Sequence, residues 1–377
     1  ASQINAGGKV RLAATGGGEA SNLNVTGSDI AGKGGTELIA DNRITLQAAE
    51  QNHREQSENR SSGWNAGIAV SYSEGSVAFG VTAGGNYGKG YGNGEDTTWR
   101  HSRIGNADSQ TVISSGGDTV IKGAQVGGRG ITLDAANLHI ESLQDSAVYK
   151  GKQQNISGQV TVGYGASGSA SYSQSNIEAE HKSVSQQSGL FAGDDGFKVN
   201  VRNHSELIGG MVTATDTAEN EGRNRFQTGT LHSSDLHNYS RYEGDSLGLG
   251  GGLSFGGGDG KQEIGGHKLM SLGSNTVSQN QATGAVSTEG NLGVNQSFGF
   301  GSDGDSQSST TESGIGSRNI VIGGETGSAA AQNLYTAIRS DNAEAHSGSL
   351  TNRFDKDQVQ KELDIQREVT QSFSRNI

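Results

Sequence analysis

Apolar and polar side chains alternate strictly along residues 64–72, which read Trp-Asn-Ala-Gly-Ile-Ala-Val-Ser-Tyr. Even-numbered positions carry Trp, Ala, Ile, Val and Tyr, whereas odd-numbered positions carry Asn, Gly, Ala and Ser. A period of two is typical of a β-strand with one apolar face and one small, polar face. The alternation resumes at Val77, Phe79 and Val81, so the pattern predicts a β-hairpin with its turn near Glu74 and Gly75.

The same alternation returns at residues 156–164, 247–255 and 292–300. Each copy ends with an aromatic residue, and the four aromatic positions are Tyr72, Tyr164, Phe255 and Phe300. The steps between them are 92, 91 and 45 residues (164 − 72, 255 − 164 and 300 − 255). A nearly constant step, followed by about half of it, indicates a degenerate internal repeat.

Short apolar runs separated by glycine and asparagine turns fill residues 1–50 and return at 118–143. The quartet that starts at Gly27 aligns with the quartet that starts at Gly123, and residues 199–210 look like a third, looser copy. Short strands at close spacing predict the successive sides of β-solenoid coils. The expected fold class is therefore all-β, a β-solenoid (β-helix) whose coils carry protruding amphipathic β-hairpins.

Polar stretches between these blocks are harder to assign. Residues 51–60 and 178–188 contain few apolar side chains, and we expect them to link hairpins to coils as helical or irregular segments. Residues 303–313 are also low in apolar content, which favours a loop or linker.

The sequence becomes helical in character after a last predicted strand at 319–324. Leu334 and Ile338 lie four residues apart behind Ser328, and apolar residues follow Asp355 near helical spacing. Ser and Asp are typical residues at a helix N-cap, so we predict a short C-terminal helical tail at 328–374. The predicted regions are a β-solenoid with hairpin extensions over 1–324 and a helical linker over 325–377.

Composition changes this picture by limiting the core and the chemistry. Glycine supplies 62 of the 377 residues and aromatic residues only 5%, so a thick core is excluded, whereas a thin core shared along stacked coils is not. Proline is absent, which suits long unbroken strand ladders. Cysteine is also absent, which excludes thiolate zinc sites and cysteine nucleophiles.

Charge and hydropathy bear on partners and location. The net charge of −12 disfavours nucleic acid as a partner, because neutralising phosphates requires a basic surface. The first residues do not resemble a signal peptide, and no apolar run approaches the roughly 20 residues of a membrane helix. We therefore expect the chain to be cut from a longer protein.

Motifs that suggest enzymatic or metal chemistry fail on their context. Residues 244–248 match a nucleophile elbow and 163–168 a dinucleotide fingerprint, but neither has the helix that such a motif needs. The Asp-Gly clusters at 193–196 and 303–305 favour ordinary turns over Ca²⁺ sites, and His232 and His237 fall on opposite faces of a strand. A β-helical polysaccharide enzyme would need an acidic cluster with Arg on one sheet face, and none is legible. We predict a non-enzymatic protein without cofactor or metal.

The alternating hairpins carry the strongest functional signal, and two interpretations of it remain open. Their apolar faces either cover the solenoid or pair with one another, as in soluble sandwiches, or they meet lipid. Nine residues is about the length of a membrane-spanning β-strand, and terminal aromatics fit the interfacial girdle of such strands. The candidate membrane- or partner-contacting residues are Trp64, Tyr72, Tyr164, Phe255 and Phe300.

Two stretches carry a family resemblance. Residues 227–236 read Gln-Thr-Gly-Thr-Leu-His-Ser-Ser-Asp-Leu, and residues 354–363 read Phe-Asp-Lys-Asp-Gln-Val-Gln-Lys-Glu-Leu. Together with the Asn- and Gly-rich strand blocks, they resemble the haemagglutinin-repeat region of filamentous-haemagglutinin exoproteins. The resemblance extends over nearly the whole chain and is greatest to the second repeat region of contact-dependent growth inhibition effectors.

The resemblance implies a role and a set of partners. Such proteins are exported through an outer-membrane two-partner-secretion transporter and form β-helical filaments on Gram-negative cell surfaces. In the growth-inhibition branch, this region is expected to help deliver the C-terminal toxin of the same chain across the target cell's outer membrane. The alternative is a filamentous adhesin that binds a surface receptor or a glycan through its loops.

Overall fold

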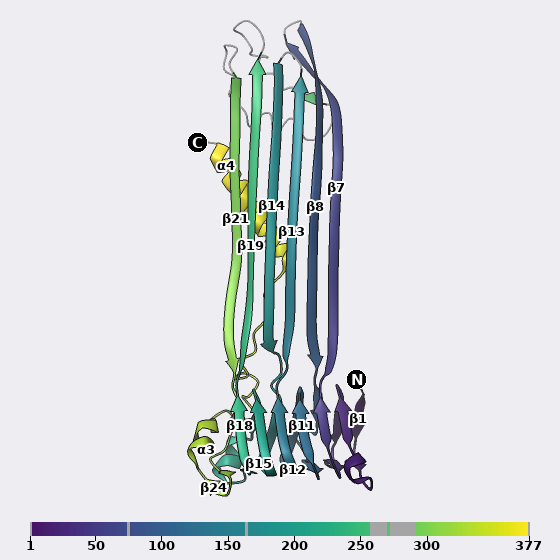
Figure 1. Cartoon of the computed structure of the whole chain (residues 1–377), viewed down its shortest axis with the longest axis vertical. Helices are drawn as coiled ribbons and strands as arrows, with labels where there is room; N and C mark the ends of the chain where they lie inside the picture. Colours follow the sequence, from purple (N-terminus) through teal and green to yellow (C-terminus); the bar gives the residue numbers. More distant parts are fainter. Residues whose placement is uncertain (1, 74–75, 163–164, 257–269, 272–291, 376–377) are drawn as a thin grey trace.

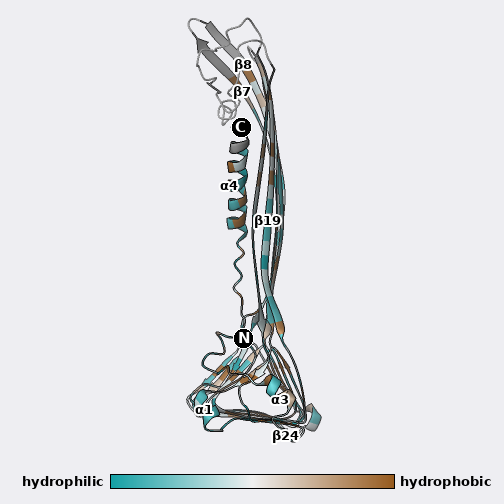
Figure 2. Cartoon of the chain, turned by 90° about the vertical axis from the view of Figure 1, so that its left-hand side faces the viewer, coloured by the Kyte–Doolittle hydropathy of each residue, from teal (hydrophilic) through white to brown (hydrophobic). Residues whose placement is uncertain are grey.

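The computed structural model describes residues 2–73, 76–162, 165–256, 270–271 and 292–375. Its described strands form two sheets, one of 17 strands and one of seven. The first winds into a β-solenoid at one end of the molecule, and the second extends away from it as a tall sheet (Figure 1). A C-terminal helix lies against that tall sheet (Figure 2). The predicted all-β fold, a solenoid with protruding hairpins and a helical tail, is confirmed.

The solenoid has three faces, each a stack of parallel strands, which gives it the triangular section seen in Figure 2. The first face contains β1 (Gln3–Ala6), β4 (Asp29–Gly32), β9 (Ser102–Ile104), the first parts of β12 (Ala124–Glu141) and β15 (Gly189–Ile208), β16 (Met211–Thr213) and β22 (Gly314–Ile315). The second contains β2 (Val10–Ala14), β5 (Thr36–Ala40), β10 (Gln110–Ser115), the middle of β12 and β15, β17 (Arg225–Thr228) and β23 (Ile320–Ile322). The third contains β3 (Leu23–Thr26), β6 (Ile44–Gln47), β11 (Asp118–Lys122), the ends of β12 and β15, and β18 (Thr230–Ser234).

Successive coils stack equivalent side chains on one another. Gln125 pairs with Arg103 and Met211 with Gly189, so one coil takes 22 residues in both places (125 − 103 and 211 − 189). Every second side chain points inward, where it meets its counterpart in the next coil. One such ladder on the second face is fully buried and runs through Leu38, Ile113, Leu133, Val199, Phe226 and Ile320. The scarce large apolar residues thus form one thin, continuous core.

Three hairpins leave the solenoid at the corner between its third and first faces, once in every second coil (Figure 1). Their strands are β7 (Ala49–Ser73) and β8 (Ser76–Arg100), β13 (Gln144–Val162) and β14 (Gly165–Val184), and β19 (Leu236–Gly256) and β21 (Leu292–Thr311). The hairpins also pair with one another, β8 with β13 and β14 with β19, so that six long strands make one antiparallel sheet. A short strand, β20 (Met270–Ser271), pairs with β7. The turn predicted near Glu74 and Gly75 lies outside the described residues.

Glycine closes the same corner in the coils that carry no hairpin. Gly27, Gly123 and Gly209 all have positive φ there, and Gly123 has a φ of 68°. A Cβ atom on Gly123 would lie 2.6 Å from both Ala48 Cβ and Leu143 Cδ1, beside the points where two hairpins join the solenoid. This corner therefore excludes side chains both by its left-handed backbone and by the hairpin stems that pack against it. The alignment of Gly27 with Gly123 in the sequence reflects this shared position.

Several polar stretches are strands and not the loops or helices that we expected. Residues 51–60 belong to β7, 178–184 to β14 and 303–311 to β21. The predictions were wrong because long antiparallel partners fix the backbone of these stretches, whereas the prediction relied on apolar content.

The helical elements among the described residues are η1 (Gly18–Ala20), α1 (Asp216–Asn220), α3 (Ala329–Leu334) and the 20-residue α4 (Lys356–Arg375). The predicted tail is therefore helical only in α3 and α4, which follow β24 (Glu325–Thr326) and are separated by residues without α-helix. Both predicted caps are present: the Ser328 side chain accepts a hydrogen bond from the Ala331 N–H, and Asp355 Oδ1 accepts from Asp357 and Gln358.

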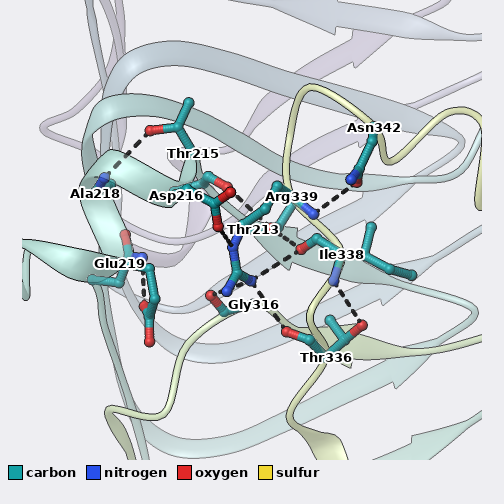
Figure 3. Close-up of polar contacts among 12 residues, drawn as sticks. Thr213, Thr215, Asp216, Ala218, Glu219, Gly316, Thr336, Ile338, Arg339 and Asn342 are labelled. Carbon is teal, nitrogen blue, oxygen red and sulfur yellow. Dashed lines mark hydrogen bonds and ion pairs between the residues drawn. The ribbon is translucent and has the colours of Figure 1, made fainter.

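The segment after α3 closes the last coil of the solenoid. Tyr335 forms a bridge with Ile315, and the Thr213 hydroxyl donates to the Ile338 carbonyl oxygen at 2.6 Å. Arg339, only 8% exposed, pairs with Asp216 of α1 at 2.7 Å and donates to the Gly316 carbonyl at 3.3 Å (Figure 3). Solenoids need such a cover, because an uncapped last coil would leave its core side chains in water.

Replacing Gly123 with Ala should destabilise the chain by about 1–3 kcal/mol, because the new Cβ both strains the backbone and collides with Ala48 and Leu143. The measurement is the midpoint of urea unfolding followed by circular dichroism. Gly7→Ala is the control, since a Cβ there meets no atom within 4 Å. Equal midpoints for the two variants would contradict the assigned role of the corner.

The third face carries a pH-sensitive contact on its outer side. His139 Nδ1 lies 2.8 Å from Glu206 Oε2, and its Nε2 lies 2.9 Å from Glu141 Oε2. The hydrogen bond with Glu141, and then that with Glu206, raises the pKa of His139, although partial burial opposes the shift. The pKa of Glu141 is lowered, first by its hydrogen bond with His139 and also by Lys122.

A raised histidine pKa adds stability that is complete below the unfolded value of 6.5 and is lost as the pH rises through the folded pKa. The lowered pKa of Glu141 adds stability above 4.5, so the contact contributes most between these two values. His139→Gln should therefore lower the melting temperature more at pH 5.5 than at pH 8. A melting-temperature difference that does not change with pH would show that the imidazolium makes no such contribution.

Candidate contact face of the hairpin sheet

The register of the six long strands separates two faces of different chemistry. Residues that pair directly across an antiparallel sheet lie on the same face. One such row runs across all six strands as Ser62, Tyr87, Ile156, Tyr172, Leu249 and Phe298. Trp64, Ile68, Val81, Val160 and Phe300 lie an even number of residues from members of this row, and therefore on the same face. We call this side the apolar face.

The large side chains of the apolar face are exposed. Trp64 is 85% exposed and Phe300 is 57% exposed. The other large apolar side chains that are exposed on this face are Ile68, Val81, Tyr87, Tyr91, Val148, Ile156, Val160, Val162, Leu247, Leu249, Leu253 and Phe298. The alternative in which the apolar faces of the hairpins cover the solenoid is therefore wrong for these residues, because the hairpins stand away from the solenoid and pair by their edges (Figure 1).

The structure places the two predicted contact residues whose side chains it describes on the same face, but at opposite edges of the sheet. Trp64 lies on β7 at one edge of the sheet, and Phe300 lies on β21 at the other edge, beside Phe298 with ring centroids 6.0 Å apart. Tyr72 and Phe255 lie in β7 and β19, but their side chains are outside the described part of the chain, as is the whole of Tyr164. Whether these five aromatics contact a membrane stays a prediction.

Sequence reasoning missed two aromatic residues of this face. Tyr87 and Tyr91 lie on β8 and are 48% and 47% exposed. Their spacing of four preserves the period of two, but glycines and asparagines occupy the positions around them and hide the pattern. The usable signal was the even spacing of aromatic residues that continues from Phe79.

The apolar band has a definite height along the strands. The rows from Ile68 to Arg60 are eight residues apart, which is roughly 27 Å at about 3.4 Å per residue. The lowest row of this band begins with Arg60 and Lys89 and ends with Leu247 and Phe300, and the next row carries Glu58, Lys152 and Asp245 on the same side. The face is thus apolar toward its far end and charged toward the solenoid.

On the opposite face, α4 lies over glycine and serine positions of β19 and β21 and packs Leu363 against Ile177 of β14 (Figure 2). A Cβ at Gly301 would lie 2.8 Å from the Leu363 carbonyl oxygen, and a Cβ at Gly299 would collide with the carbonyl of Arg367. Ser246 Oγ donates to the same Leu363 carbonyl at 3.1 Å. The helix can approach this closely only because these strand positions lack larger side chains, and Leu363 becomes fully buried as a result.

Side chains of α4 also accept hydrogen bonds from backbone N–H groups along the outer edge of β21. The Phe300 N–H donates to Thr370 Oγ1 at 2.9 Å, and the Ser302 N–H donates to Gln366 Oε1 at 2.9 Å. At its other end α4 is anchored by an ion pair between Lys356 and Glu55 of β7. An exposed strand edge is a template for unwanted pairing, so α4 both covers one face and blunts one edge of the sheet.

Other candidate sites resolve into ordinary structure. Residues 244–248 lie inside β19 and form no elbow, and residues 303–305 lie inside β21 and not in a turn. Within the ranges that the structure describes, no group of three or more His, Cys, Asp or Glu residues is placed to hold a metal ion. Among those same residues, no helix is both long enough and apolar enough to cross a membrane.

Comparison with known proteins agrees with this architecture. The family model described as hemagglutinin repeat matches residues 1–156. A tRNA nuclease CdiA of Yersinia mollaretii is 40% identical over 66% of this chain and 8% of its own length. A toxin CdiA of Escherichia coli is 33% identical over 98% of this chain and 11% of its own length. A deoxyribonuclease CdiA of Yersinia pseudotuberculosis is 32% identical over 78% of this chain and 27% of its own length. No solved structure matches the chain.

Fold and repeats together define a haemagglutinin-repeat β-solenoid. This family model covers the first 156 residues, and the chain is homologous to the CdiA proteins of contact-dependent growth inhibition over most of its length. It spans about a tenth of the length of the first two relatives, so the activities in their names belong to proteins far longer than this chain.

Replacing Gly301 with Val should detach α4, because the new side chain would occupy the space of the Leu363 carbonyl while remaining well suited to a strand. Hydrogen exchange of the α4 amides measures this, and we expect their protection to be lost while that of the solenoid is retained. Gly85→Val on the apolar face is the control, since the nearest atom to a Cβ there lies at 3.5 Å. Unchanged protection of α4 in Gly301→Val would contradict close packing as the cause of docking.

Proposed function

We propose that this chain is a non-enzymatic surface repeat region that helps deliver a C-terminal toxin across the target-cell outer membrane in contact-dependent growth inhibition. The single observation that carries the proposal is the exposed apolar face, which extends across six paired strands from Trp64 to Phe300. Contiguous apolar surface of this kind usually marks a protein or membrane contact, because it is costly to leave in water.

Two properties of the face support lipid as the contact. Its apolar band is roughly 27 Å tall, close to the hydrocarbon thickness of about 30 Å of a bilayer. Its lower rows carry charges of both signs, Arg60, Lys89 and Lys152 beside Glu58 and Asp245, which suit the polar headgroup region at the boundary of such a band. The face opposite, covered by α4, stays away from the lipid in this arrangement.

The homology with CdiA proteins supports the remaining partners of this proposal. In this proposal the region is secreted through an outer-membrane two-partner-secretion transporter and stands on the surface of a Gram-negative cell. Residues 1–324 form the scaffold and the contact sheet, and residues 325–377 lead toward the toxin of the same chain. The region reaches the target-cell outer membrane during delivery.

The test is flotation of the full chain with outer-membrane vesicles. Changing Trp64, Tyr72, Tyr164, Phe255 and Phe300 together to Ser should reduce vesicle association by at least about tenfold, since each aromatic buried in an apolar phase contributes about 1.5–3 kcal/mol. Ile365 and Val369 on α4 are also exposed, so changing these two to Ser controls for a general loss of surface hydrophobicity.

Both variants are first checked for an unchanged circular dichroism spectrum. The proposal fails if the folded five-residue variant associates as well as the unaltered chain, or if the α4 variant loses association to the same extent. A defined protein receptor captured equally well by the five-residue variant would favour the adhesin alternative.

A further inference from the structure

A groove lies on the outer side of the second face of the solenoid, whereas the hairpins leave at the corner between the third and first faces. It has a volume of about 890 Å³ and lies over β12, β15 and β17, with the residues after α1 as one wall. The wall is held by Arg223, which pairs with Asp195 at 3.3 Å. The volume falls in the range of about 300–1,000 Å³ that is typical of ligand sites.

Two cations lie side by side in this groove, and neither forms an ion pair with an acidic residue in the part of the chain that the structure describes. Lys198 of β15 pairs directly with Arg225 of β17, so their side chains share one row on the outer surface. Arg225 donates a hydrogen bond only to Gln227 Oε1, at 2.9 Å, and Lys198 makes no hydrogen bond or ion pair with any residue that the structure describes. Like charges directly opposite on a sheet repel each other, so this pair favours a bound anion.

The two acidic residues in the groove do not supply that anion. Asp195 is shared by Arg129 at 3.2 Å and Arg223 at 3.3 Å, and Asp134 pairs with Arg202 at 2.6 Å. Both carboxylates are thus already neutralised. The groove is therefore suited to binding an anion, whereas its ion-paired carboxylates are not placed to act as a catalytic acid or base.

The outward-facing row that ends in Lys198 and Arg225 begins, on the first coils, with a pair of opposite charge. Arg11 of β2 pairs with Glu37 of β5, and Glu37 accepts both Lys9 at 2.8 Å and Arg11 at 3.4 Å. Two cations there have a carboxylate between them. The pair at Lys198 and Arg225, at the other end of the row, has no such carboxylate among the described residues.

The surroundings of the cations select the kind of anion. Asp134, Asn200 and Gln227 form the next outward-facing row, in which the Asn200 amide donates to Asp134 Oδ2 at 2.9 Å and keeps its own oxygen as an acceptor, and Asn319 and Thr132 also line the groove. Amide and hydroxyl side chains suit the hydroxyl groups of a sugar. The lining contains no aromatic side chain on which a base could stack, and the net charge of −12 disfavours a nucleic acid polymer.

We propose that this groove binds an acidic oligosaccharide. A carboxylate or sulfate of the sugar lies between Lys198 and Arg225, and neighbouring hydroxyls bond to Asn200 and Gln227. The site would give the solenoid a contact with surface glycans that is separate from the lipid contact of the hairpin sheet and does not depend on it.

Isothermal titration of the full chain with hexagalacturonate tests this proposal, with maltohexaose as the uncharged sugar and sodium sulfate as the simple anion. Lys198→Gln with Arg225→Gln should weaken hexagalacturonate binding by at least about tenfold, because two charge-assisted contacts are lost. Lys9→Gln with Arg11→Gln removes the same charge from the same sheet and should leave the affinity within about twofold.

Binding of hexagalacturonate that is tighter than that of maltohexaose and of sulfate, and sensitive only to the first double variant, is the expected result. The proposal is overturned by no binding, by equal binding of maltohexaose, by equal affinity for sulfate alone, or by equal losses in the two double variants. Gln227→Ala keeps both charges and should weaken the sugar but not sulfate. The five-residue Ser variant of the hairpin sheet should bind hexagalacturonate normally, so failure of the lipid proposal and failure of this one are distinguishable.

Discussion

The architecture depends on a match between two spacings. Neighbouring strands in a sheet lie about 4.8 Å apart, and stacked coils of a parallel solenoid have the same separation. A hairpin contributes two strands and is inserted once in every two coils. The hairpins therefore arrive side by side without a gap, and β8 meets β13 and β14 meets β19 in hydrogen-bonding register.

This match explains why the coils alternate in kind. A hairpin in every coil would crowd four strands into the width of two, whereas a hairpin in every third coil would leave the strand edges unpaired. The coil between two hairpins must instead close tightly beside their stems, and a glycine with positive φ does so at Gly27, Gly123 and Gly209. The repeat is thus a pair of coils with one hairpin.

The composition of the hairpins turns this shared sheet into a two-sided surface. Glycine and serine on one face allow the α4 backbone to reach the strands, and large apolar residues on the other face remain open. The scarce large apolar residues fall into two sets, one buried in the core of the solenoid and one exposed on the tall sheet. One set holds the coils together, and the other is available for a partner, while the outer surface of the solenoid offers a polar groove of its own.

By itself, the sequence determined the strands, their solenoid arrangement, the hairpins and the two helix caps. Alternation at residues 64–72 and the glycine corners depend only on neighbouring residues, so these features are legible along the chain. Tertiary structure decided that polar residues 51–60 and 303–311 continue as strands, because their backbones are fixed by partners far away in sequence. The tertiary structure also decided that the apolar face stays exposed, that α4 packs on the opposite face of the hairpin sheet, and that Lys198 lies beside Arg225. Each of these depends on which strand edges meet, and a period of two cannot specify that, since it leaves every pairing partner open.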